Sequence, residues 1–288
     1  MSQFTDYAEN NLVDMIRAQA WALASNLYMG LASAATDSAV TELTGTGYAR
    51  VASVRNLTNW AGTQAPASVT ASTGTTHASS NNVAIDWGTS GSAWGTANFV
   101  VIYDASSAGN ALVYLPLATP IVIGSAQPVS IAIGALNFTL GVTGGCSDYL
   151  ANQLIDFIFR GQAFTFPATM YEALLTGAPS NAGGGIEVGG GIGYARVAVA
   201  GTLVNWAGTQ AVGTTTVSTG TGGQTSNNAA ISFPAPSASW GTLGWQAEYD
   251  ASIGGNLLFW ASLSAAKTVP AGSSAPSFPA AARTITFA

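Results

Sequence analysis

Residues 48–51 read Tyr-Ala-Arg-Val, and the same four residues recur at 194–197, an offset of 146 positions (194 − 48). The longer stretch Asn-Trp-Ala-Gly-Thr-Gln at 59–64 recurs at 205–210 with the same offset. Further matches at this offset join 72–75 to 218–221, 80–82 to 226–228, 94–96 to 240–242, 103–106 to 249–252, and 109–110 to 255–256. An offset that stays constant over so much of the chain indicates two tandem copies of one fold.

The copies are expected to meet in the Gly-rich connector 141–145. The first domain then spans residues 1–143, and its second copy spans residues 144–288. Each half has about 140 residues, a size at which a domain can bury its own core. We therefore expect each half to fold alone.

Within each copy, the pattern predicts one short α-helix followed by strands. Ser147 is a suitable N-cap, Gly161 follows Arg160 as a suitable C-cap, and apolar residues between them recur at helical spacing. Short runs rich in Val, Ile, Tyr and Phe follow, separated by Gly/Ser/Thr/Asn clusters; in the first copy they are 27–31, 48–54, 83–87, 99–103, 111–117, 121–123, 129–133 and 136–140. The sequence therefore predicts a mainly β fold of two tandem β-sandwich (jelly-roll-like) domains, each preceded by one short α-helix.

Charge is scarce in this chain. Its 288 residues include 7 Lys or Arg, 13 Asp or Glu and 1 His, for a net charge of −6, while 48% are hydrophobic. On a monomer surface of roughly 11,000 Å², that is about one charge per 570 Å², against about one per 160 Å² at average composition. A surface with so few charges predicts close association with other proteins, including other copies of this chain.

The same composition argues against several classes of partner. Seven scattered cations do not predict a nucleic-acid-binding surface. No uninterrupted apolar run is long enough to span a membrane, and the first residues lack the pattern of a signal peptide.

Little in the sequence points to catalysis or to a cofactor. The single cysteine, Cys146, falls in the connector, and the single histidine, His77, falls in a polar loop; neither is repeated in the other copy. A Cys–His dyad is the alternative interpretation, and the preferred one is a linker thiol and a loop imidazole. One Cys and one His do not predict a metal centre, so we expect no catalytic residue, no metal and no cofactor.

Asp104 and Asp250 are candidate binding or turn positions. Each stands in the repeated pattern Tyr-Asp-Ala-Ser-x-x-Gly-Asn. Carboxylate and amide oxygens suit a hard cation or a sugar. The preferred interpretation is a turn in which Asp caps its own backbone and Gly takes a positive φ.

Trp60 and Trp206 are the second pair of candidates. Exposed tryptophan is common at protein and carbohydrate contacts. Preservation at equivalent positions of both copies instead favours a shared role in the core, as it does for Trp94 and Trp240.

Two further features of the repeat can be interpreted in structural terms. Arg50 and Arg196 are expected to bind a carboxylate of their own copy, and Glu42 and Glu187 are the candidate partners. The Thr/Ser/Gly-rich tracts 66–80 and 212–226 read either as flexible loops or as edge strands that become ordered against a neighbour.

The order helix, Gly-Tyr-Ala-Arg-Val, Ser-Asn-Asn, Trp-Gly, and Asp-Ala-Ser-x-x-Gly-Asn-Leu-Leu-Phe resembles a recurrent domain of tailed-bacteriophage virion proteins. Members of that family are often labelled tail-fibre proteins. The second copy carries the fuller pattern at 193–197, 240–241 and 255–259, and the first copy departs from it at 111–114, which read Ala-Leu-Val-Tyr. The resemblance covers nearly the whole chain.

This resemblance implies a non-enzymatic structural protein, made in the host cytoplasm and carried on the outer surface of the virion. Its expected partners are capsid or tail proteins and further copies of itself. Compact domains and few charges favour capsid decoration, as a cement protein, over a tail-fibre or other tail position. The alternative is a host-recognition module of a tail fibre that binds surface carbohydrate.

Overall fold

The computed structural model describes residues 4–141 and 145–287, and it has the same order of elements in both halves of the chain. The first half contains α1 (Asp6–Ile16), β1 (Asn26–Ala35), β2 (Val40–Glu42), β3 (Val51–Val54), β4 (Ala78–Ser80), β5 (Ile85–Thr89), β6 (Gly95–Tyr103), β7 (Ala111–Ile123), β8 (Pro128–Ile131) and β9 (Asn137–Thr139). The second half contains α2 (Asp148–Arg160), β10 (Thr169–Gly177), β11 (Ile186–Glu187), β12 (Val197–Ala200), β13 (Gln224–Ser226), β14 (Ile231–Ser232), β15 (Gly241–Tyr249), β16 (Leu257–Val269), β17 (Ser277–Phe278) and β18 (Thr284–Thr286). The predicted mainly β fold, with an early helix in each of two repeated halves, is confirmed.

Each half is built on one five-stranded antiparallel sheet and two short ribbons. In the first half the sheet runs β2-β1-β6-β7, with β3 also paired to β1, and the ribbons are β4-β9 and β5-β8. In the second half the sheet runs β11-β10-β15-β16, with β12 paired to β10, and the ribbons are β13-β18 and β14-β17. The repeat seen in the sequence is therefore a repeat of strand pairing.

Two strands that the sequence predicts as separate form one strand in the structure. The runs 111–117 and 121–123 form the single strand β7, whose pairing with β6 shifts register between Ala97 and Phe99. Pro116 and Pro120 lie within this strand. Proline is tolerated there because β7 is an edge of the sheet, where a missing backbone N–H breaks no ladder.

Both helices begin at a capping residue, and α2 begins and ends at the expected ones. The hydroxyl of Ser147 accepts a hydrogen bond from the backbone N–H of Leu150, and Gly161 ends the helix with φ 68°. In the first copy, Thr5 accepts in the same way from the N–H of Ala8. These caps satisfy backbone groups that a helix end otherwise leaves without partners.

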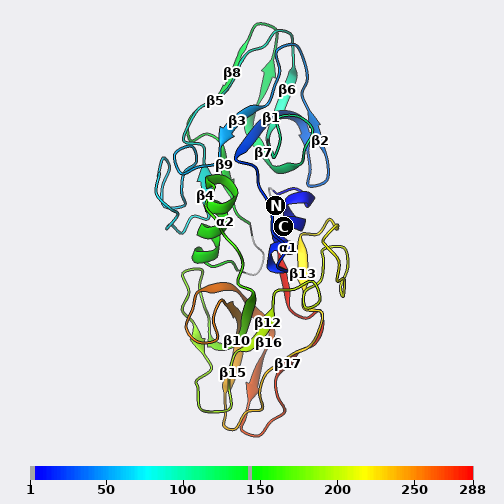
Figure 1. The fold of residues 1–288 in the computed structure, drawn as a ribbon. Helices are drawn as coiled ribbons and strands as arrows, with labels where there is room; N and C mark the ends of the chain where they lie inside the picture. Colours follow the sequence, from blue (N-terminus) through cyan, green and yellow to red (C-terminus); the bar gives the residue numbers. More distant parts are fainter. Residues whose placement is uncertain (1–3, 142–144, 288) are drawn as a thin grey trace.

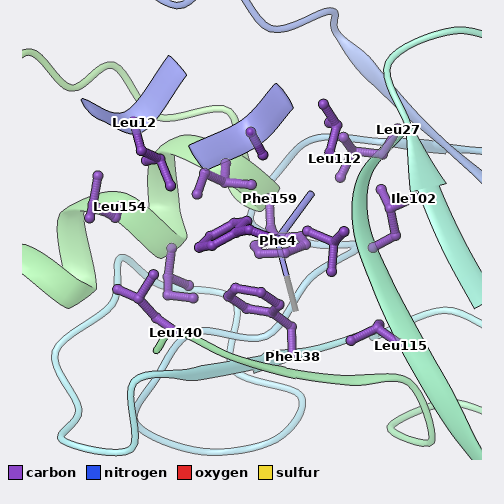
Figure 2. Packing of buried hydrophobic residues seen from close by; sticks show 14 of the residues in the cluster. Phe4, Leu12, Leu27, Ile102, Leu112, Leu115, Phe138, Leu140, Leu154 and Phe159 are labelled. Atoms are coloured by element: carbon purple, nitrogen blue, oxygen red, sulfur yellow. The ribbon is translucent and has the colours of Figure 1, made fainter. Parts of the chain in front are cut away.

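One hydrophobic core joins the two halves. It contains buried side chains of both helices together with residues of both sheets, and Figure 2 shows Leu12 of α1, Leu154 of α2 and Phe138 of the first half in one cluster. Phe4 and Phe287, near opposite ends of the chain, belong to the same cluster. The expectation that each half buries a core of its own therefore differs from the structure, in which the helices form a common centre.

The arrangement of the helices explains this common core. In Figure 1, α1 and α2 lie in the middle of an elongated molecule, with the first half's sheet at one end and the second half's sheet at the other. Each helix begins on the sheet of its own half, since the Thr5 N–H donates to the carbonyl of Leu112 and the Ser147 N–H to that of Leu258. The last turn of each helix reaches the opposite half. The predicted connector 141–145 includes positions 142–144, which lie outside the described residues.

Candidate functional site

Each helix ends in a buried ion pair that holds a loop of the opposite half. Arg160 of α2 lies 2.6 Å from Asp156 one turn earlier, and its Nε donates to the backbone carbonyl of Trp60 at 2.9 Å. Asp156 in turn accepts from the backbone N–H and the hydroxyl of Ser72, at 2.8 and 2.6 Å. Arg160 also donates to the carbonyl of Thr70 at 2.6 Å. We call this set the α2 clamp.

The same contact is repeated with the halves exchanged. Arg17, just after α1, lies 2.6 Å from Asp14 and donates through Nε to the backbone carbonyl of Trp206 at 2.9 Å. Asp14 accepts from the N–H and the hydroxyl of Ser218, at 2.9 and 2.7 Å. We call this set the α1 clamp. The two polar tracts are thus ordered against a helix of the same chain, and nothing in the sequence of either half alone signals these contacts.

Trp60 and Trp206 lie inside the molecule. Each side chain is 1% exposed, and the ring of Trp60 packs 5.2 Å from that of Phe159 at its centroid. Trp94 and Trp240 are also buried, and their indole N–H groups donate to the carbonyls of Thr46 and Ile192. A buried ring cannot stack on a sugar or a partner protein, so these positions contribute to the core.

Asp104 and Asp250 form closed turns. Asp104 accepts from the backbone N–H of Asn110 at 2.7 Å and from its side-chain amide at 2.8 Å. Asp250 makes both bonds to Asn256 at 2.7 Å. Gly109 takes φ 67°, and a Cβ there would lie 2.4 Å from Asp104 Oδ1. Both oxygens of each carboxylate therefore serve the turn.

The repeated Tyr-x-Arg motif builds a polar network on the surface side of each sheet. Arg50 is paired to Glu42 at 2.7 and 2.9 Å, donates to two carbonyls of the 104–110 turn, and lies 3.3 Å from the ring centroid of Tyr103. Burial raises the pKa of Tyr103 to about 12, and the charge of Glu42 adds to this. Arg196 repeats the pairing with Glu187 at 2.7 and 2.9 Å. The predicted partners of both arginines are confirmed.

A polar hollow opens beside each of these networks. The first has a volume of about 580 Å³ and is lined by Tyr7, Asp37 and Arg50, among others. The second has a volume of about 290 Å³ and is lined by Asp148, Tyr149 and Tyr249, among others. Both are open depressions on equivalent parts of the two halves, since Asp6, Tyr7 and Asn110 line the first where Asp148, Tyr149 and Asn256 line the second.

Cys146 and His77 do not form a dyad. His77 Nε2 lies 2.7 Å from Asp148, and this contact joins the first half to α2. Cys146 is buried, and burial raises the pKa of its thiol far above the ordinary range. Such a thiol stays protonated and unreactive.

Nearly every cation of the chain is used internally. Five arginines are ion-paired, and Arg55 donates to backbone carbonyls of residues 23, 24, 157 and 158. Of the cations in the described ranges, exposed Lys267 is the one for which neither an ion pair nor a hydrogen bond is present. The outer surface is therefore even poorer in positive charge than the composition indicates.

Residues 4–141 and 145–287 contain no group of three or more His, Cys, Asp or Glu side chains placed to hold a metal ion. Neither helix there is long and apolar enough to cross a membrane.

Comparison with known families gives one match that covers both halves. The family described as "Podophage GP4 fiber I protein gp80" matches the chain twice, over residues 3–139 and 145–286. The two matched regions coincide with the two copies of the structural repeat. No curated protein matches the chain.

Proposed function

Because this chain belongs to the podophage GP4 fiber I protein family, and so is a structural protein of a phage virion, we propose that it forms part of a fibre on the outer surface of the particle. It acts there by adhesion over a broad neutral surface, without turnover and without a bound metal. Its partners are other virion proteins and further copies of the same chain.

The observation that best supports this proposal is that most of the arginines are paired within the molecule. The clamps and the Arg50 and Arg196 networks consume cations that would otherwise lie at the surface. A surface of Ser, Thr, Asn and Gly can dock without stripping water from many ions. It also orders at small entropic cost, since these side chains are short.

The family description favours a fibre over the capsid-decoration position that the sequence favours. Both positions use the same kind of contact, a wide surface between copies and neighbours. Isolated apolar side chains, among them Val122 and Ile186, are 70% and 66% exposed and fit contact with further copies of the chain.

Washing purified virions tests the mode of attachment. Contacts with few ion pairs depend weakly on salt, because there is little charge to screen. We expect the protein to remain on particles washed in 1 M salt (a concentration at which the Debye length is about 3 Å) with and without a chelator. Release by salt alone would contradict attachment by a neutral surface, and release by the chelator alone would assign Asp104 and Asp250 to a cation.

Carbohydrate recognition is the second candidate function, and the paired hollows favour it. Each offers tyrosine, carboxylate and amide groups at an open surface, and the hollows occupy equivalent places in both halves. A glycan array probed with the full chain separates the two functions. Binding that is lost in Tyr7→Ala would support recognition, whereas an array without signal would leave adhesion between virion proteins.

A further inference from the structure

Four buried apolar positions of the first half are polar in the second half. The strand registers establish the equivalence, since Met29 faces Ile102 and Leu31 faces Val100, whereas Glu172 faces Glu248 and Leu174 faces Gln246. The fourth position is fixed by a common bond, because the N–H groups of Leu136 and Arg283 donate to the equivalent side chains of Asn81 and Asn227. All eight side chains are buried; the pairs are Met29/Glu172, Val100/Gln246, Ile102/Glu248 and Leu136/Arg283.

We call Glu172, Gln246, Glu248 and Arg283 the polar layer. Along β10, Met170 belongs to the shared core, Glu172 comes next on the same face, and Leu174 belongs to a separate cluster. That separate cluster, the distal core, consists of Leu174, Val188, Ile231, Phe233, Trp240, Leu243 and Val269. In the first half the equivalent residues are continuous with the shared core. The polar layer therefore divides the second half where the first half is undivided.

The layer holds two carboxyl groups and one guanidinium away from water. Arg283 lies 3.3 Å from Glu172 through Nε and 3.0 Å from Glu248 through Nη2, and the three side chains are at most 3% exposed. One guanidinium can balance one ionised carboxylate. The second carboxylate would then be a buried charge without a partner, which costs several kcal/mol in proteins.

A proton removes this imbalance. Among the described groups, one oxygen of Glu172, Oε1 of Glu248 and the oxygen of the Gln246 amide have no hydrogen-bond partner, and Glu248 Oε2 has only its ion-pair contact with Arg283. A protonated carboxyl gains an O–H donor and can bond to the other one, whereas two carboxylates only accept. Burial raises the pKa of Glu172 well above its ordinary range; Arg283 lowers it in part, and Glu248 raises it again.

Other charges around the layer do not take over this role. Strands β12, β13, β14, β17 and β18 contain no ionisable side chain, and Lys267 of β16 is exposed. On the helices, Asp14 and Asp156 are paired in the clamps, Asp148 binds His77, and Glu9 lies beside Gly223. The charged groups that act on Glu172, Glu248 and Arg283 are the three themselves.

We propose that the polar layer is a proton-operated latch between the shared core and the distal core of the second half. With one proton held between Glu172 and Glu248, the layer is neutral overall and the distal core stays closed. When the proton leaves, the buried layer carries an unbalanced negative charge, and the distal core opens to let water reach the carboxylates.

The direction of the pH effect follows from linkage. A glutamate exposed by opening returns to its ordinary pKa of about 4.3. Its folded pKa is raised, so it stabilises the closed state fully below the ordinary value, and that stabilisation is lost as pH rises through the folded value. Between the two values, opening releases one proton, and the opening equilibrium rises about tenfold per pH unit before it levels off.

Hydrogen exchange of the full chain, followed by mass spectrometry between pH 5 and 9, tests the latch. The readout is the ratio of exchange in segments 231–245 and 262–278 to exchange in the equivalent first-half segments 85–99 and 116–131. The ratio cancels the intrinsic effect of pH on amide exchange. We expect it to rise about tenfold per pH unit over at least one unit; a ratio that stays constant across the range would overturn the proposal.

Two variants assign the effect to the layer. Glu248→Gln cannot ionise, so the ratio should become independent of pH. The variant that carries all four first-half residues, E172M/Q246V/E248I/R283L, should also lose the dependence and exchange more slowly, because a packed apolar layer needs no proton. Lys267→Gln is the matched control in the same half and should keep the wild-type slope. If the slope persists in both layer variants, the latch is elsewhere and the proposal fails.

Discussion

The guanidinium of Arg160 donates a 2.9 Å hydrogen bond to the backbone carbonyl of Trp60, a residue 100 positions earlier in the other half of the chain. Arg17 makes the equivalent bond to Trp206 across 189 positions. The two halves therefore exchange their helices reciprocally, and each half completes the other. This exchange, more than the sheets, distinguishes the molecule from two domains joined by a linker.

Separated halves should not fold alone. Fragment 1–143 lacks Arg160 and Phe159, and fragment 144–288 lacks Arg17 and Leu12, so each leaves part of the shared core exposed. We expect each fragment by itself to unfold without a cooperative transition, and an equimolar mixture to form a complex with one. Circular dichroism melts and size-exclusion chromatography measure both. Cooperative melting of either fragment alone would show that the exchange is dispensable.

Arg160→Ala should strongly destabilise the chain. It leaves Asp156 buried without its cation, and breaking one side of a buried ion pair costs about 3–5 kcal/mol. The equivalent Arg17→Ala should cost a similar amount. Chemical denaturation of the full chain measures the loss, with Lys267→Ala as a surface control expected within about 0.5 kcal/mol of wild type. Equal stability of Arg160→Ala and the control would show that the α2 clamp does not stabilise the fold.

Trp94→Ala and Trp240→Ala should each destabilise the chain by about 3–5 kcal/mol, because a large buried ring is replaced by a cavity. The two should differ in where the damage appears. Trp240 lies in the distal core beyond the polar layer, so its loss should raise hydrogen exchange there and leave the shared core protected. Trp94 belongs to the shared core, so its loss should raise hydrogen exchange throughout that core. Identical exchange patterns in the two variants would argue against a divided second half.

Asp104→Ala should cost about 1 kcal/mol, the usual value of a hydrogen-bonded turn contact, and Asp250→Ala about the same. Since both carboxylates are fully used within the turn, chelator or added Ca²⁺ should leave the melting temperature of the wild-type chain unchanged. Differential scanning calorimetry reports both results. A calcium-dependent rise that disappears in Asp104→Ala would show that the turn binds a cation.

The sequence predicts what depends on near neighbours. The cap at Ser147, the stop at Gly161 and the turn around Asp104 are set by residues within a few positions, and all three take the expected form. The repeat offset predicts that the halves are alike. It does not predict which half receives each helix, because the same residues at the same offset would fit either packing.

The repeated motifs do not predict the polar layer either, for a different reason. Glu172, Glu248 and Arg283 are far apart in the chain and belong to no motif. A position-by-position comparison of the two copies identifies them, since acidic or basic residues occupy the positions equivalent to Met29, Ile102 and Leu136. The differences between the copies therefore indicate the polar layer, whereas the repeated motifs mark positions that serve the fold.

The reciprocal exchange also delays the completion of the fold while the chain is being synthesised. Helix α1 leaves the ribosome early, but the carbonyl of Trp206 that Arg17 binds lies 189 residues later. At about 5–20 residues per second, roughly 10–40 seconds pass before that partner is made. During this time the apolar side of α1 has only its own half's sheet to cover it, so the nascent chain is most vulnerable to aggregation before its second half emerges.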